Sequence, residues 1–337
     1  MSDFFLVSKE EQLVRMTRAG HAALQHWNIE RADLRLIKYR ENAVFEMSNG
    51  DFRAALRLHR HGYHSDEALH SELQWMNALS ESGIRVPSVI RTAAGNAFAH
   101  VHDDELPGVT QVDLFEWIDG EQLGSIEEGI SDAGEVAKTF APIGELAAKV
   151  HNQAVSWHPP DGFTRHAWDA DGLAGEQPVW GRFWEIEAAT DAQRDLLFRA
   201  RDRIYRDLSA LPKSPGKYSI IHADFVAENI LVDDQGVRLI DFDDAGFGWH
   251  VFELVTALLF LRGEDYFAAA EAALIDGYRK HRPFTDDDLE LLPLFYLARS
   301  TTYVGWVHTK SETDTAKELT PFILELACGL AEEYLSD

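Results

Sequence analysis

The chain has little cysteine and little positive charge. Among its 337 residues there is one cysteine, and 31 Lys and Arg stand against 57 Asp and Glu, a formal net charge of −26 at pH 7. One cysteine excludes a disulfide within the chain, and the apolar surroundings of Cys328 (LELACGLA) favour a small core residue over a nucleophile. The acidic excess argues against a general nucleic-acid binder, which needs a basic surface, and against docking on an anionic membrane.

Long hydrophobic runs are also missing. The N-terminus, MSDFFLVSKEEQ, has neither a basic region nor an apolar run of signal-peptide length. No apolar run elsewhere approaches the roughly 20 residues that span a bilayer. Together with the single cysteine, this predicts a cytoplasmic protein that binds neither nucleic acid nor membrane. The oligomeric state stays unknown at this point.

What the chain does contain changes along its length. Short, partly alternating apolar runs predict strands over residues 33–39, 42–47, 52–59, 85–92, 96–102 and 110–118. Apolar residues at helical spacing predict helices over residues 8–27, 65–83, 141–154, 193–211, 249–261, 266–280, 287–307 and 319–335. We therefore expect an α+β protein of two lobes, a β-rich N-terminal lobe over 1–117 and a mainly helical C-terminal lobe over 118–337.

Several local signals refine this picture. Ser8 and Glu11 predict a capping box at the start of the first helix, and the Asn-Gly pair in SNGD, residues 48–51, predicts a hairpin. TDDDLE, residues 285–290, predicts a capped helix start with acidic residues in the first turn. The segment 157–184, rich in Trp, Pro, Gly and Asp, is expected to be a long loop, with its Trp side chains packed rather than lining a cleft.

The segment IIHADFVAENILVDDQGVRLIDFDDAG, residues 220–246, carries seven carboxylates beside two short apolar runs. ILV and VRLI predict a hairpin about DDQG, in which 232 pairs with 238 and Asn229 lies opposite Asp241. An amide oxygen and a carboxylate would then converge at one end, and such oxygens are ligands of Mg²⁺. Asp233 and Asp234 are expected at the opposite end, as solvated turn residues.

The polar residues around this hairpin follow a known spacing. His222, Asp224 and Asn229 form H-x-D-x-x-x-x-N, and Asp241 and Asp243 form D-x-D after the second strand. Protein kinases have an H-R-D-x-x-x-x-N catalytic loop followed by a metal-binding D-F-G. The alternative interpretation is a His-containing acidic turn in a stable core.

With these motifs, the chain resembles the aminoglycoside phosphotransferase and choline kinase-like family, which includes type II homoserine kinases and the bacterial stress-response kinases. The resemblance covers most of the chain and rests on HADFVAEN, IDFDD, AALRLHR, HSELQWMNAL, DLFEWIDGE, GELAAKVHN and FELV. It implies a protein kinase-like two-lobed fold. It also implies ATP- and Mg²⁺-dependent transfer of the γ-phosphate to a hydroxyl of a small molecule.

The resemblance also implies roles for the motif residues. Asp224 would be the general base that accepts or orients the proton of the acceptor hydroxyl. Asn229 and Asp241 would hold Mg²⁺, and Asp243 would assist a second metal or only support the site. His222, a further candidate in the catalytic loop, is expected to support that loop rather than take part in the chemistry.

Nucleotide contacts are implied for the N-terminal lobe. Arg57 projects from a strand face opposite Ala54, Leu56 and Leu58, and with Glu72 it would form the ion pair that holds the ATP phosphates. The family has Lys on this strand, and Arg offers a planar fork instead of a point charge. Hinge backbone groups would meet adenine at Phe115, Glu116 and Trp117.

Some alternatives stay open. Lys38 could replace Arg57, although a solvated strand residue is favoured. In place of a Gly-rich loop, residues 40–42 would form the turn over the phosphates. HRHGYH, residues 59–64, is expected to be a solvated loop rather than a metal site.

The acceptor pocket is expected between the C-terminal helices and the segment 157–184, where Asp244 would attract an amine. A Ser/Thr protein kinase of the stress-response type, and a nucleotide-binding pseudokinase scaffold suggested by Arg57, are the competing functions.

Overall fold

The computed structural model describes residues 4–40, 42–123, 136–234 and 236–336. The chain forms two compact units, one of residues 1–120 with 159–164 and one of residues 121–158 with 165–337. Within the described ranges, no helix has both the length and the apolar character that crossing a bilayer requires.

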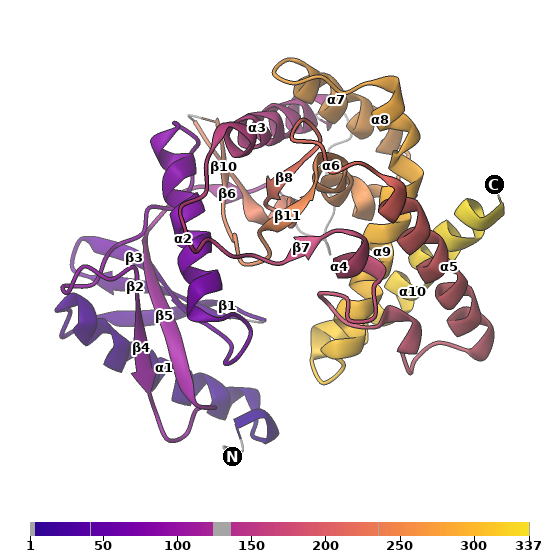
Figure 1. Cartoon of the computed structure of the whole chain (residues 1–337). Helices are drawn as coiled ribbons and strands as arrows, with labels where there is room; N and C mark the ends of the chain where they lie inside the picture. Colours follow the sequence, from indigo (N-terminus) through magenta and orange to yellow (C-terminus); the bar gives the residue numbers. More distant parts are fainter. Residues whose placement is uncertain (1–3, 41, 124–135, 235, 337) are drawn as a thin grey trace. The chain divides into compact units, whose positions relative to one another are not determined.

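The first unit is built on a five-stranded antiparallel sheet in the order β1-β2-β3-β5-β4 (Figure 1). Its elements are α1 (Lys9–Leu24), β1 (Asp33–Tyr39), β2 (Ala43–Asn49), β3 (Phe52–Leu58), α2 (Asp66–Glu81), β4 (Phe98–His102) and β5 (Val109–Glu116). Alternation along β3 buries Ala54, Leu56 and Leu58 in the core that includes α1. Arg57 points to the other face, where it meets Glu72 of α2. The two helices therefore cover opposite faces of the sheet.

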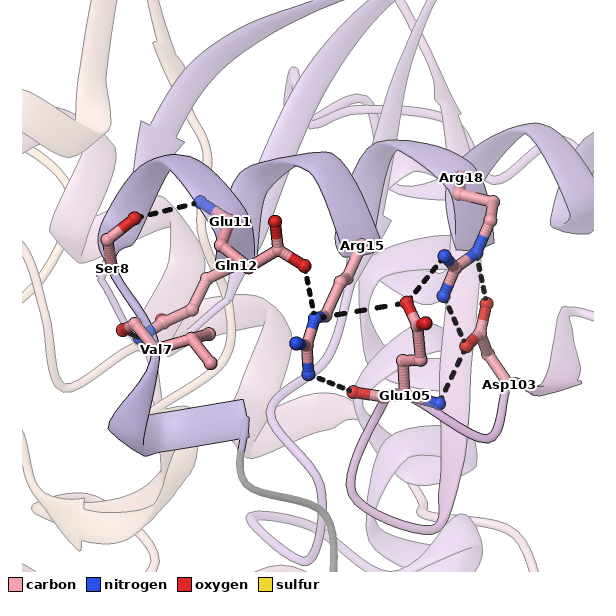
Figure 2. Close-up of polar contacts among 8 residues, drawn as sticks. All are labelled: Val7, Ser8, Glu11, Gln12, Arg15, Arg18, Asp103 and Glu105. Carbon is pink, nitrogen blue, oxygen red and sulfur yellow. Dashed lines mark hydrogen bonds and ion pairs between the residues drawn. The ribbon is translucent and has the colours of Figure 1, made fainter.

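Helix α1 begins at the predicted N-cap, Ser8, but only one of the two bonds of the predicted capping box forms (Figure 2). The hydroxyl of Ser8 accepts the backbone N–H of Glu11 at 3.3 Å. In a capping box the Glu11 side chain would accept the backbone N–H of Ser8. Here it pairs with Arg15 instead, at 2.8 Å. One turn later, Arg18 bonds Asp103 in the loop between β4 and β5 at 2.6 Å.

The predicted strand over 85–92 is wrong. In this stretch only Val89 forms an isolated bridge, to Phe115 of β5. Two backbone bonds flank that bridge, from Ile90 to Leu114 at 2.8 Å and from Glu116 to Ser88 at 2.9 Å. The proline at position 87 has no N–H to give to a sheet, so the extended segment touches β5 without becoming a regular strand.

The second unit is mainly helical, with two small sheets in the orders β10-β9-β6 and β7-β11-β8. Its strands are β6 (Glu121–Gln122), β7 (Ala167–Trp168), β8 (Tyr218–Ile221), β9 (Ile230–Asp233), β10 (Gly236–Leu239) and β11 (Gly246–Trp249). Its helices are α3 (Val136–Ser156), α4 (Ala170–Ala174), α5 (Asp191–Ala210), α6 (His250–Leu258), α7 (Phe267–Arg279), α8 (Asp286–Glu290), α9 (Leu292–Thr309) and α10 (Asp314–Ser336). Short 3₁₀ turns lie at Phe4–Leu6, Gln25–Trp27, Phe183–Glu185, Ala227–Asn229 and Leu259–Leu261.

Four expectations for this unit are tested directly. The helix predicted over 287–307 divides into α8, capped by Thr285, and α9, which has a proline in its first turn. The segment 157–184 contains β7 and α4, so it is not simply a long loop. Trp168 and Trp180 in that segment are buried, as packing residues should be, whereas Trp157 and Trp184 are partly exposed. Cys328 is buried in α10, as predicted.

Helices α3 and α7 lie side by side in Figure 1 and approach too closely for a side chain at two glycines. A Cβ atom at Gly144 would lie 1.9 Å from the carbonyl oxygen of Leu274, and one at Gly277 would lie 2.0 Å from that of Ala141. Both clashes are with backbone atoms, which cannot turn aside as a flexible side chain does. These glycines therefore set the distance between the two helices.

We expect Gly144→Ala to lower the free energy of unfolding by about 1–3 kcal/mol, because the added methyl forces the helices apart. Gly329 is the matched control, since it is exposed in α10 and a Cβ atom there meets nothing within 4 Å. Gly329→Ala should raise stability by up to about 1 kcal/mol through helix propensity. Urea unfolding measures both variants, and equal stabilities would contradict the close-packing argument.

Candidate active site

The acid-rich hairpin forms, but its register differs from the predicted one. Val232 pairs with Val237, and the pairing continues outward until the backbone of Ile240 donates to Asn229 at 3.0 Å. Asn229 therefore lies opposite Ile240 and not Asp241. The strands pair as far as Asp233 and Gly236, so the connection has two residues instead of the predicted four, and every partner moves by one position. Gly236 has a positive φ of 114°, as its turn position requires.

The two aspartates at the turn end have different surroundings. Asp233 is partly buried and pairs with Arg238 on the neighbouring strand at 2.8 Å. The expectation of a solvated Asp233 is therefore wrong, because the register brings a cation beside it. Asp234 is exposed, as predicted.

Asp224 and Asn229 lie in contact, as their spacing predicts. The amide nitrogen of Asn229 donates to Asp224 Oδ2 at 2.6 Å and to the Asp224 carbonyl oxygen at 3.0 Å. The other carboxylate oxygen, Oδ1, accepts from the Arg299 guanidinium at 3.1 Å. Both oxygens of this carboxylate are thus held, while its side chain stays 21% exposed. Arg299 is a site residue that the sequence interpretation missed, and its one signal is a cation inside the apolar helix LFYLARSTTYVGWV.

The backbone that carries Asp224 is fixed by a buried acid from α6. Glu253 accepts the N–H of His222 at 2.9 Å and that of Ala223 at 2.7 Å. Burial raises the pKa of Glu253, and the two N–H groups and the nearby His222 oppose that rise. Ala223 has a positive φ of 64°, a conformation that costs a non-glycine residue free energy and persists only where neighbours enforce it.

His222 is fully buried, and backbone groups use both of its ring nitrogens. Nε2 lies 3.0 Å from the carbonyl oxygen of Ile240, and Nδ1 accepts the N–H of Asp224 at 3.2 Å. The ring therefore connects the Asp224 loop to the end of the hairpin. The rings of Phe225 and Phe242 pack edge-on against it.

The D-x-D residues after the hairpin differ in exposure. Asp241 is exposed and has a positive φ of 65°, whereas Asp243 is buried. Arg165 donates to the carbonyl oxygens of Asp243 and Ala245 and so holds the backbone of this turn. Two of the three non-glycine residues with positive φ in the described ranges, Ala223 and Asp241, therefore lie in the two loops that carry the motif.

Asp244 lies in an aromatic environment. The Trp180 indole donates to its carboxylate at 3.3 Å. The Trp168 indole donates to its carbonyl oxygen at 2.9 Å, and His166 contacts the same oxygen at 3.1 Å. These rings come from the segment 157–184, so the structure brings Asp244 and that segment together.

In the first unit, the predicted ion pair between Arg57 and Glu72 is present at 2.8 Å. A second buried acid also holds the guanidinium, since Asp113 of β5 accepts from its Nε at 3.1 Å and its Nη2 at 2.7 Å. His59 lies 3.0 Å from the same carboxylate and is buried, so the expected solvated loop is wrong at this residue. Burial raises the pKa of Asp113, but Arg57 and His59 outweigh burial and lower it to about 2.

The remaining nucleotide candidates lie at the ends of strands. Phe115 and Glu116 end β5, and the Trp117 ring lies 4.6 Å from the guanidinium carbon of Arg53. Lys38 is half-buried on β1. The β1–β2 connection is closed by a backbone bond from Arg40 to Asn42 at 3.3 Å, and residue 41 lies outside the described ranges.

The lowered pKa of Asp113 predicts a pH-dependent contribution to stability. Its ionised form stabilises the fold fully above the ordinary value of 3.8, and that contribution is lost as the pH falls toward 2. We expect Asp113→Asn to lower the free energy of unfolding by about 2–4 kcal/mol at pH 7 and by less at pH 3.

Asp103→Asn is the control, because its partner Arg18 is 48% exposed and the pair should be worth at most about 1 kcal/mol. Urea unfolding at the two pH values separates the variants. A loss at Asp113 that is no larger than at Asp103, or that does not depend on pH, would contradict the assignment.

Comparison with known proteins agrees with this geometry. The model of the phosphotransferase enzyme family (APH) matches residues 34–287. Amicoumacin kinase of Bacillus subtilis (strain 168) is 22% identical over 307 residues, which are 88% of this chain and 86% of that protein.

Two solved structures are similar along nearly their whole length. A microcompartment-associated aminopropanol kinase has a TM-score of 0.82 at 29% identity, covering 95% of this chain and 98% of that one. Amicoumacin kinase hAmiN, in complex with AMP-PNP, Ca²⁺ and Ami, has a TM-score of 0.74 at 17% identity, covering 97% and 94%. The chain therefore belongs to the phosphotransferase enzyme family, has its protein kinase-like α+β fold, and is a kinase that acts on an alcohol group.

Proposed function

We propose that the protein transfers the γ-phosphate of ATP, with Mg²⁺, to a hydroxyl of a small, amine-bearing molecule. The observation that carries this proposal is the Asp224 carboxylate, which is held at both oxygens and still partly exposed. A general base must lie within hydrogen-bond reach of the hydroxyl whose proton it takes. Asp224 meets this requirement for an acceptor that approaches its exposed side.

Phosphoryl transfer asks little covalent chemistry of the protein, so positioning and charge dominate. Asp224 orients the acceptor hydroxyl and receives its proton. The hydroxyl oxygen forms a bond to the γ-phosphorus of ATP while the bond from that phosphorus to the β–γ bridging oxygen breaks, and ADP leaves. His222 keeps the loop in place through its two backbone contacts and touches no reacting atom. Glu253 supports the same loop by accepting hydrogen bonds from the backbone N–H groups of His222 and Ala223.

The oxygen donors near the end of the hairpin suit a hard cation. Asn229 uses its amide nitrogen for both contacts with Asp224, so its amide oxygen is directed away from that carboxylate. Asp241 adds an exposed carboxylate. Mg²⁺ takes such oxygens and keeps water and substrate phosphates as its other ligands. In this proposal Asn229 and Asp241 hold Mg²⁺, Asp243 assists from its buried position, and the bound ion offsets the phosphate charge.

Nucleotide binding is assigned to the first unit. Arg57 and Glu72 form the expected ion pair, and Phe115, Glu116 and Trp117 offer the hinge backbone for adenine. The AMP-PNP and Ca²⁺ bound to the similar hAmiN support nucleotide and divalent-metal use. Because Asp113 holds two donors of Arg57, we assign Arg57 to fixing Glu72 and the sheet as well as to contacting phosphate.

The acceptor is assigned to the region of Asp244. Its carboxylate accepts from the Trp180 indole, and aromatic rings around an acid are a suitable environment for a cationic amine. The net charge of −26 also favours a cationic substrate in solution. The names of the similar aminopropanol and amicoumacin kinases support a small-molecule acceptor.

Asp224→Asn tests the proposed function. We expect kcat to fall about 10²–10⁴-fold, because the amide cannot accept the hydroxyl proton. The assay follows ADP release with Mg²⁺ against a panel of amino-alcohols, aminoglycosides and generic protein substrates. Asp234→Asn is the matched control on the exposed hairpin turn and should leave turnover unchanged.

Each outcome of the panel is informative. If only the protein substrates are phosphorylated and no small molecule is, the function is that of a protein kinase and the proposal is wrong. ATP binding without any Asp224-dependent transfer would replace it by a nucleotide-binding scaffold.

Asp244→Asn tests the acceptor assignment. For an amine-bearing acceptor identified on the panel, we expect KM to rise about tenfold or more, since a charged hydrogen bond is lost. The fold is expected to stay intact, because an amide oxygen at this position can still accept from the Trp180 indole, and Trp168 and His166 bond the Asp244 carbonyl oxygen. The control acceptor is the same alcohol without its amine. An equal KM increase for both acceptors would show that Asp244 does not recognise the amine.

A further inference from the structure

Arg299 lies in the middle of α9 and is fully buried. Its Nη2 donates to Asp224 at 3.1 Å and to the Tyr303 hydroxyl at 2.9 Å. Its guanidinium carbon also lies over three aromatic rings, those of Trp180, Phe252 and Tyr303, at 5.0, 5.2 and 4.4 Å from their centroids. This one side chain therefore joins α9, α6 and the segment 157–184 to the catalytic loop.

The hydrogen bonding of the buried Arg299 guanidinium is incomplete among the described residues. Its Nε and Nη1 are buried and have no hydrogen-bond partner among the described residues. A buried charge is costly unless its hydrogen bonds are complete, and replacement by an apolar side chain of similar volume is often neutral or stabilising. The carboxylate that Arg299 bonds, Asp224, is itself 21% exposed, so water could solvate it if the arginine were absent. Burying this cation therefore calls for a reason other than stability.

We propose that Arg299 is a positioning residue for Asp224 in phosphoryl transfer, an inference that rests on the proposed function. Asn229 holds Oδ2 and Arg299 holds Oδ1, so donors from two different elements keep the carboxylate in one orientation. The fixed guanidinium also offsets part of the negative charge that Asp224 and the neighbouring Asp244 bring to the acceptor side. Arg299 acts through Asp224 and touches no substrate atom.

The test is Arg299→Met, which keeps an apolar stem among the three rings and removes the charge. We expect kcat to fall about 10–100-fold because the base is no longer held in its reactive orientation. The KM for ATP should stay unchanged, and the melting temperature should stay equal or rise. Arg203→Met is the control, since it breaks an arginine–aspartate pair on α5 with Asp207 and should leave kcat unchanged.

Arg299→Lys keeps the charge without the planar fork, and its kcat should lie between those of the wild type and Arg299→Met. If both variants lose activity only in proportion to their loss of folded protein, Arg299 is structural and the inference is overturned. The same conclusion follows if Arg299→Met is folded and has wild-type kcat.

A double variant separates this inference from the proposed function. If Arg299 acts through Asp224, then adding Arg299→Met to Asp224→Asn should lower kcat no further than Asp224→Asn alone. A further loss equal to that of the single Arg299 variant would contradict the inference. If instead Asp224→Asn keeps wild-type turnover, the proposed function itself fails, whatever Arg299→Met does.

Discussion

One buried carboxylate, that of Glu253, fixes the backbone of the loop that carries Asp224. Glu253 accepts two successive N–H groups, those of His222 and Ala223, and a buried N–H without its acceptor would cost about 1–3 kcal/mol. This contact holds Ala223 at its positive φ and so aims Asp224 out of the loop. Phe252, the neighbour of Glu253 on α6, lies under Arg299. Helix α6 therefore supports the backbone of the loop and the cation that contacts its carboxylate.

Two of the buried arginines, Arg57 in the first unit and Arg299 in the second, are paired differently. Arg57 meets two fully buried acids, Glu72 and Asp113, and uses the fork geometry that distinguishes it from lysine. Arg299 meets one partly exposed acid and leaves two nitrogens without hydrogen bonds in the described structure. The two acids around Arg57 suit a role in holding the sheet together. The incomplete hydrogen bonding of Arg299 costs stability, so its charge is expected to serve the function of the site. The family has lysine at this position of β3, and the arginine that stands here instead is held by a second acid, Asp113.

Local patterns allowed much of the first unit, and the contacts within the motif that holds Asp224, to be predicted. Strand β1, the hairpin at 48–51 and the contact between Asp224 and Asn229 depend on residues close in sequence, where alternation and spacing are informative. The register of β9 and β10 was missed because a two-residue and a four-residue connection are both compatible with DDQG. Arg299 and Asp113 were missed for a different reason. Each meets its partner over a long sequence separation, and no local pattern reports such a pairing.

The carboxylates of the acid-rich segment 220–246 lie in different environments. Asp233 is offset by Arg238 within the hairpin, and Asp224 by Arg299 from a distant helix. Asp244 accepts from an indole that carries no charge, and Asp241 is exposed at the end of the second strand. The protein thus supplies cations to the carboxylates that it must hold in place. In the proposed function, Asp241 is assigned to the metal ion and Asp244 to the amine of the acceptor, so each of these two carboxylates would meet a positive charge that a ligand brings.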